Sequence, residues 1–160
     1  MACLELVNGR SKKGLRGWWS AGAALVARAV VPYFLKAGEG RIINIGVSEG
    51  TRKRKGFVPY GPSRAGTESL SHIMAQDLAG LGVTVNLFQP GGATETGMLP
   101  EESRGRMGTS FLRPEVMAAP VLFLCSDESA GLNDVEIIAR DFQEWIAKWK
   151  TDSGCIDNGQ

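Results

Sequence analysis

The stretch Arg41-Ile42-Ile43-Asn44-Ile45-Gly46-Val47 is a short, mostly apolar run that is rich in β-branched side chains. Such a run predicts a strand buried on both faces, as in a parallel sheet, because strands with one solvated face usually alternate apolar and polar residues. Val83-Thr84-Val85-Asn86-Leu87-Phe88 predicts a second strand of this kind. A third is expected at Asp134 to Ala139, around Val135-Glu136-Ile137-Ile138.

Helical patterns alternate with these strands. Residues 18–37 are apolar on nearly all sides, which predicts a helix buried on more than one side, broken or kinked near its end by Pro32. Residues 60–80 carry a single apolar stripe, and a further helix is expected over 114–125, beginning at Pro114. This alternation predicts an α/β architecture with a parallel sheet.

The other segments carry weaker patterns. Leu4 to Val7 has the composition of a short strand, and residues 48–59 and 93–112 are expected to be loops, the second with a short helix near 100–106. Residues 142–160 begin amphipathic, then become polar and are expected to fray. A chain of 160 residues predicts one domain, with 1–17 and 143–160 as atypical tails.

Composition argues against several classes of protein. The formal net charge of +1 gives no long-range field that would favour nucleic acid or an anionic membrane. The first residues lack the pattern of a signal peptide, and no apolar run is long enough to span a bilayer. We therefore expect a cytoplasmic protein with no nucleic-acid or membrane partner.

Metal and disulfide chemistry have little support in the sequence. Cys3, Cys125 and Cys155 are far apart and odd in number, so free thiols in a reducing compartment are expected. His72, the single histidine, falls inside the helical pattern of 60–80 and is expected to be a surface or partly buried helix residue. No metal site is expected.

Polar groups that can carry chemistry follow the first two strands. Ser48 comes directly after the first strand and can donate a hydrogen bond to a substrate carbonyl oxygen. Tyr60 and Arg64 are four residues apart on one helix face, where a fixed positive charge would favour the phenolate and make proton transfer plausible. The same spacing is also common in simple stacking or surface pairs. The turn after the second strand, with Pro90, Gly91, Gly92, Thr94 and Thr96, offers backbone groups and hydroxyls that can hold an amide.

All these groups are expected at one edge of the sheet, because the carboxyl ends of parallel strands meet there and α/β folds bind their ligands at that edge. Four motifs in the same order resemble those of the short-chain dehydrogenases/reductases. They are the strand Gly40 to Ile45 followed by Ser48, the helix start Tyr60 to Gly66 in place of Tyr-x-x-x-Lys, the strand and Pro-Gly turn Gly82 to Gly92, and the segment Leu124 to Gly131. The resemblance covers about residues 18–142.

This resemblance implies a partial Rossmann-like, doubly wound parallel sheet of about three to four strands with flanking helices. It also implies an oxidoreductase that transfers a hydride between NAD or NADP and a small carbonyl or alcohol substrate. Tyr60 would be the general acid/base, Ser48 would polarise the substrate oxygen, and Arg64 would stand where the family's lysine binds the nicotinamide ribose. The cofactor contacts would come from Tyr60, Arg64, Pro90, Gly91, Gly92, Thr94 and Thr96.

The chain departs from the family pattern in three places. Arg64 replaces a lysine, and its planar fork is not equivalent to a compact ammonium. Trp19 falls at the position of the family's catalytic asparagine. The Gly-x-x-x-Gly-x-Gly turn and the rest of the first half have no counterpart, since Gly9, Gly14 and Gly17 have the wrong spacing and are interpreted as loop. An alternative is therefore a non-catalytic remnant that binds a partner.

Without a first half, the strand that contains Ile42 is expected to have an unpaired edge. Marginal stability or self-association would follow. The helices 18–37 and 60–80 correspond to the family's usual dimer-forming helices, so a homo-oligomer is expected. The sequence selects neither a substrate nor one of the two cofactors.

Overall fold

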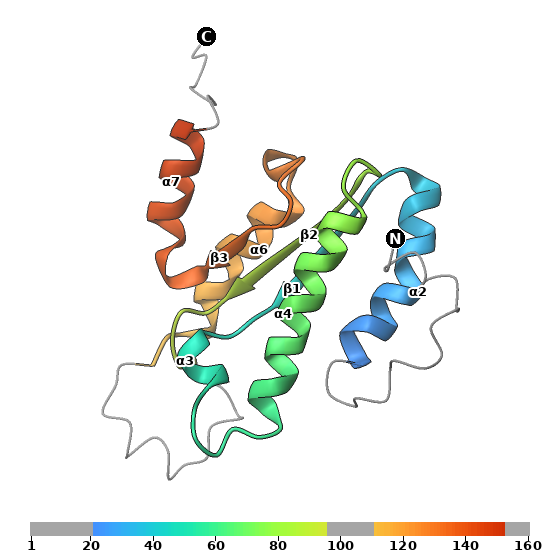
Figure 1. Cartoon of the computed structure of the whole chain (residues 1–160). Helices are drawn as coiled ribbons and strands as arrows, with labels where there is room; N and C mark the ends of the chain where they lie inside the picture. The colour runs from blue at the N-terminus through green and yellow to red at the C-terminus, as the bar shows by residue number, and fades with distance from the viewer. Residues whose placement is uncertain (1–20, 96–110, 153–160) are drawn as a thin grey trace.

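Three parallel strands form the centre of the protein. The structure, a computed structural model, describes residues 21–95 and 111–152 (Figure 1). Its sheet has the order β1-β2-β3 and consists of β1 (Gly40–Ile45), β2 (Val83–Gln89) and β3 (Glu136–Ile138). Within these described residues β1 pairs only with β2 and is therefore an edge strand.

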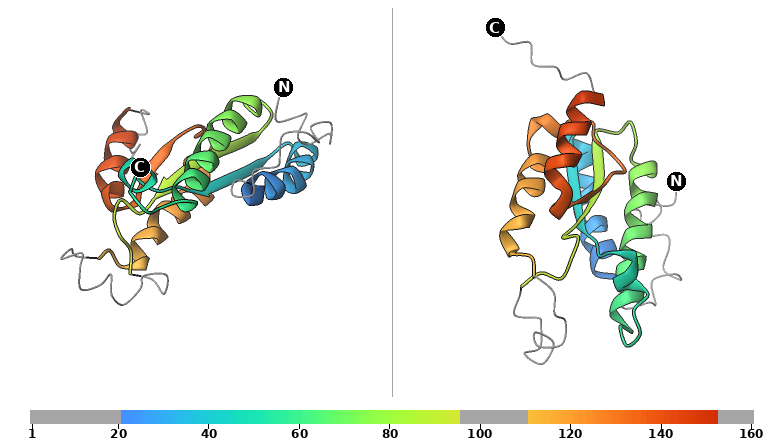
Figure 2. Two further views of the ribbon diagram at one scale, coloured as in Figure 1. Left: turned by 60° about the horizontal axis from the view of Figure 1, so that its bottom comes forward. Right: turned by 90° about the vertical axis from the view of Figure 1, so that its left-hand side faces the viewer.

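Helices cover both faces of the sheet (Figure 2). One face carries α2 (Ala21–Ala37) and α4 (Tyr60–Asp77), and the other carries α6 (Ala118–Cys125) and α7 (Phe142–Asp152). The short elements are α3 (Glu49–Arg52) and the 3-10 helices η1 (Pro114–Met117), η2 (Asp127–Ser129) and η3 (Ala139–Asp141). No helix of the described residues is both long enough and apolar enough to cross a membrane.

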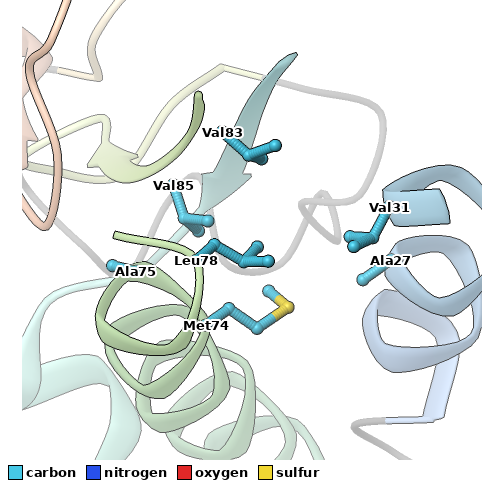
Figure 3. Packing of buried hydrophobic residues seen from close by; sticks show 7 residues of the cluster. All are labelled: Ala27, Val31, Met74, Ala75, Leu78, Val83 and Val85. Carbon is cyan, nitrogen blue, oxygen red and sulfur yellow. The ribbon is translucent and has the colours of Figure 1, made fainter. Parts of the chain in front are cut away.

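The side chains of β2 alternate between two separate cores, as the period of a strand requires. Val83 and Val85 point toward α2 and α4, where they pack against the fully buried Val31 and Leu78. Figure 3 shows this cluster, which consists of Ala27, Val31, Met74, Ala75, Leu78, Val83 and Val85. Phe88 points to the opposite face and joins the second core.

The second core is built around Phe123 of α6, which is only 7% exposed. Its ring lies edge-on to Trp149 and Trp145, with centroids 5.3 and 5.8 Å away, and is tilted against Phe142 at 5.8 Å. These distances are typical of favourable aromatic pairs. The aromatic contacts hold α7 onto α6, so residues 142–152 form a packed helix at the start of the segment 142–160.

The predicted α/β class and parallel sheet are confirmed, with differences at the ends of elements. The expected loop 48–59 is wrong in its first part, because Ser48 caps the short helix α3. The helix that contains Pro32 continues to Ala37, so the proline does not end it. The third strand is shorter than predicted, and Asp134 takes a left-handed conformation with φ of 62° just before it. Several predictions lie outside the described residues: the strand 4–7, the helix near 100–106, and those on Gly9, Gly14, Gly17, Trp19, Thr96, Cys3 and Cys155.

Candidate active site

Ser48 lies just beyond the carboxyl end of β1. The N–H of Gly46 donates to the carbonyl of Phe88 at 2.8 Å, which keeps the chain beside β2 after the strand ends. Ser48 then forms the N-cap of α3, where its Oγ accepts the Thr51 N–H at 3.4 Å and lies 3.0 Å from Thr51 Oγ1. The residue is exposed, so its hydroxyl is accessible to a substrate.

Tyr60 begins α4, and its ring is covered by Arg64 from the next turn. The guanidinium carbon of Arg64 lies 5.2 Å from the centroid of the Tyr60 ring, a cation–π contact. Arg64 also donates from NH1 to the carbonyl of Ile45 at 3.4 Å. One side chain thus connects the tyrosine with the last residue of β1.

The two helices that carry Ser48 and Tyr60 pack closely together. A Cβ on Gly61 would lie 2.2 Å from the backbone oxygen of Arg52, so only glycine fits where α4 begins against α3. Arg52 also forms an ion pair with Glu68, one turn beyond Arg64 on α4. The structure therefore brings the segments of Ser48, Tyr60 and Arg64 to the same end of the sheet.

The turn after β2 is held in place by the chain that follows β3. Gly91 has φ of +85°, and a Cβ there would lie 2.5 Å from Cγ2 of Ile138. The backbone N–H of Arg140 donates to the Pro90 carbonyl at 3.1 Å, and its NH1 donates to the Gly91 carbonyl at 2.8 Å. Both carbonyl oxygens of the turn therefore accept hydrogen bonds from Arg140.

Arg140 is itself held by a bidentate ion pair with Asp141. Its Nε and NH2 donate to the two carboxylate oxygens of Asp141 at 2.8 and 3.1 Å. These hydrogen bonds raise the pKa of the Arg140 guanidinium and lower the pKa of the Asp141 carboxyl. Sequence reasoning missed this clamp, and nothing in the local pattern indicates that Arg140 reaches a turn 49 residues earlier.

Four buried polar side-chain atoms lack a hydrogen-bond partner in the described part of the chain; two of them are NH1 of Arg52 and Oε1 of Gln89, and the other two belong to predicted site residues. The latter two are Nε of Arg64 and Oγ1 of Thr94. Thr94 pairs through its backbone with Leu112, which places its hydroxyl beside the Pro-Gly turn. An unsatisfied buried donor or acceptor is costly, and a bound ligand would remove that cost. Both atoms belong to residues for which the sequence predicts cofactor contacts.

His72 is partly exposed and lies away from this site. Its Nδ1 is 2.6 Å from a carboxylate oxygen of Asp134, so it ties α4 to the loop before β3. In the ranges 21–95 and 111–152, no group of three or more His, Cys, Asp or Glu side chains is placed to hold a metal ion. Cys125 is a free, exposed thiol.

Comparison with known proteins gives a consistent result. The family model described as short chain dehydrogenase matches residues 20–106. The 3-oxoacyl-[acyl-carrier-protein] reductase FabG of Thermotoga maritima is 37% identical, over 66% of this chain and 46% of its own length. The acetoacetyl-CoA reductase of Allochromatium vinosum is 35% identical, over 70% of this chain and 48% of its own.

Solved structures agree. The 3-ketoacyl-(acyl-carrier-protein) reductase from Brucella melitensis, complexed with NADH, matches with a TM-score of 0.62 at 26% identity, over 73% of this chain and 51% of its own. A putative short-chain alcohol dehydrogenase from Sinorhizobium meliloti matches with a TM-score of 0.64 at 27% identity, over 74% of this chain and 51% of its own. The chain spans about half the length of these relatives. It belongs to the short-chain dehydrogenase family, whose oxidoreductase fold it shares in part.

Proposed function

We propose that this chain takes part in NAD(P)-dependent oxidoreduction of a carbonyl or alcohol substrate at the site formed by Ser48, Tyr60 and Arg64. The observation that carries the proposal is the position of Arg64, which covers the ring of Tyr60 and reaches the end of β1. The exposed hydroxyl of Ser48 lies beyond the same strand end. A hydrogen-bond donor, a phenol and a fixed cation are the groups that this chemistry requires.

Each residue has a distinct task in the proposed reduction. Bound nicotinamide cofactor would supply the hydride to the carbonyl carbon. Ser48 Oγ donates a hydrogen bond to the carbonyl oxygen and stabilises the negative charge that develops there. Tyr60 gives its phenolic proton to the same oxygen, and Arg64 stabilises the phenolate that remains. In the oxidation of an alcohol, Tyr60 takes the proton instead.

The unpartnered atoms support a cofactor beside these residues. Nε of Arg64 is a donor that a ribose hydroxyl would satisfy, and Oγ1 of Thr94 can pair with the amide of a nicotinamide. The turn of Pro90, Gly91 and Gly92 would approach the same amide with its backbone, and Thr96 is proposed to assist. One structurally similar protein was solved with NADH and another with bound NADP, so both NAD and NADP are candidate cofactors for this chain.

Arg64 in place of a lysine and Trp19 in place of an asparagine support the proposal that activity is impaired. The names of the two curated relatives suggest 3-oxoacyl thioesters as the first substrates to test. We further propose a cytoplasmic protein that binds neither nucleic acid nor membrane.

Replacing Tyr60 by Phe tests the assigned role, because it removes only the hydroxyl. We expect cofactor-dependent turnover of an acetoacetyl thioester to fall at least about hundredfold, the usual contribution of general acid–base catalysis. Turnover is measured by oxidation of NADH and NADPH. Tyr33→Phe is the matched control: Tyr33 is the chain's other tyrosine, is 74% exposed on α2, and should leave turnover unchanged. Undiminished turnover in Tyr60→Phe would reject the role.

The second candidate, a non-catalytic module that binds a partner, is favoured by a specific surface. Leu25, Val26 and Tyr33 on α2 are 53%, 63% and 74% exposed, and Ile73 on α4 is 48% exposed. Three of these four side chains belong to one helix, and groups of exposed apolar side chains are typical of interaction sites. If calorimetric titration detects no binding of NADH or NADPH, this candidate replaces the first.

The same helices are proposed to form a homo-oligomer, through 18–37 and 60–80. Size-exclusion chromatography with light scattering should then give a dimer or larger assembly at micromolar concentration. Val26→Glu, which places a charge within the apolar surface, is expected to shift the protein toward monomer. Gln143→Glu, at an exposed position of α7 on the other face of the sheet, also adds one negative charge but outside the surface, and should not. A monomeric wild-type protein would contradict the proposal.

A further inference from the structure

Positive charge is concentrated around the candidate site. Residues 48–68 contain five cationic side chains and two carboxylates, a net charge of +3, whereas the whole chain has a net charge of +1. Four of the cations are consecutive: Arg52, Lys53, Arg54 and Lys55. They begin at Arg52, the last residue of α3, and continue into the segment that leads to the start of α4 at Tyr60.

The structure divides these four cations into two kinds. Arg52 pairs with Glu68, and Lys53 pairs with Glu49, whose pKa is lowered by the hydrogen bond from that lysine. Arg54 and Lys55 are exposed, and no carboxylate within the described ranges pairs with either. Arg52 and Lys53 thus stabilise the local structure, whereas the charges of Arg54 and Lys55 are available to a ligand.

Arg54 is connected to the candidate acid/base by a cation–π contact and an edge-on aromatic pair. Its guanidinium carbon lies 5.2 Å from the centroid of Phe57, and the Phe57 ring lies edge-on to Tyr60 with centroids 6.0 Å apart. The guanidinium is therefore within about 11 Å of the tyrosine ring, roughly one Debye length at 0.1 M salt. The Phe57 ring holds the guanidinium of Arg54 by its face, and the N–H groups at the edge of that guanidinium can bind an anion.

We propose that Arg54 and Lys55 form an anion-binding site at the rim of the active site and select carbonyl substrates that carry a phosphate or carboxylate. This inference rests on the proposed function for the carbonyl chemistry, but the binding step does not require it. An arginine fork recognises both anions, and the adjacent lysine adds a second charge. Only the part of the substrate away from the carbonyl touches this site.

The experiment measures substrate binding in the absence of cofactor. Isothermal titration of the wild-type chain compares acetoacetyl-CoA with the neutral acetoacetyl thioester of N-acetylcysteamine, and 7-oxooctanoate, whose carboxylate lies six bonds from its ketone, with its neutral methyl ester. At least one anionic member should bind about tenfold more tightly than its neutral counterpart at low ionic strength, since two exposed charge contacts supply about that factor. The pair that shows the difference identifies phosphate or carboxylate as the anion.

The double variant Arg54→Gln/Lys55→Gln should lose this preference and keep its affinity for the neutral ligand. Arg28→Gln/Lys36→Gln removes the same charge from exposed positions of α2 and should retain the preference. Equal wild-type affinity for anionic and neutral ligands, no binding of any ligand, or an equal loss in both double variants would overturn the inference. Preference for the anion without turnover would count only against the proposed function.

Discussion

Phe123→Ala is expected to lower the free energy of unfolding by about 3–5 kcal/mol, the usual cost of removing a buried phenylalanine. The side chain is 7% exposed and contacts the rings of Phe142, Trp145 and Trp149. Its removal leaves a cavity between α6 and α7, and the aromatic pairs that it forms are lost as well. Because these rings pack α7 against α6, the last turns of α7 should unfold more readily than in the wild-type protein.

Urea denaturation followed by circular dichroism measures the change. A lower midpoint at an unchanged slope would show lost stability and not an altered unfolded state. Leu122→Ala is the matched control, because Leu122 precedes Phe123 on the same helix and is 70% exposed. Its effect should stay within about 0.5 kcal/mol. Equal midpoints for the two variants would contradict the assignment of Phe123 as the centre of this core.

The elements with strong local patterns could be predicted from the sequence. The β-branched run at Ile42 and Ile43 indicated β1, and the single apolar stripe over 60–80 indicated α4. The spacing of Tyr60 and Arg64 is a property of a helix alone, so their side-chain contact needs no knowledge of the rest of the chain. The convergence of segments at one sheet edge follows from parallel topology.

Contacts between distant segments could not be predicted in this way. Arg140 clamps a turn 49 residues earlier, and the fit of Gly61 against Arg52 depends on how α3 meets α4. The short helix α3 itself was missed, because one capping serine and four residues give no periodic pattern. These contacts depend on tertiary packing, which a single sequence does not record.

The contact at Gly61 should also decide whether the candidate site assembles, and Gly61→Ala is the sharpest test of it. The added Cβ would lie 2.2 Å from the Arg52 backbone oxygen, and a backbone atom cannot move aside as a flexible side chain can. We expect a loss of up to about 3 kcal/mol in the free energy of unfolding, at the upper end for an overpacked site. The alternative to that strain is a shift of α3 away from α4, which would carry the Ser48 segment with it.

Such a shift should lower any turnover by about hundredfold, because a displacement of about 1 Å between catalytic groups has effects of that size. Gly50→Ala is the control within α3 itself, since a Cβ there meets nothing within 4 Å. It should leave turnover unchanged and add up to about 1 kcal/mol of stability through helix propensity. Thermal unfolding and cofactor oxidation are measured on both variants. If Gly61→Ala had the same thermal stability and the same turnover as Gly50→Ala, the junction of α3 and α4 would not be what holds Ser48 beside Tyr60.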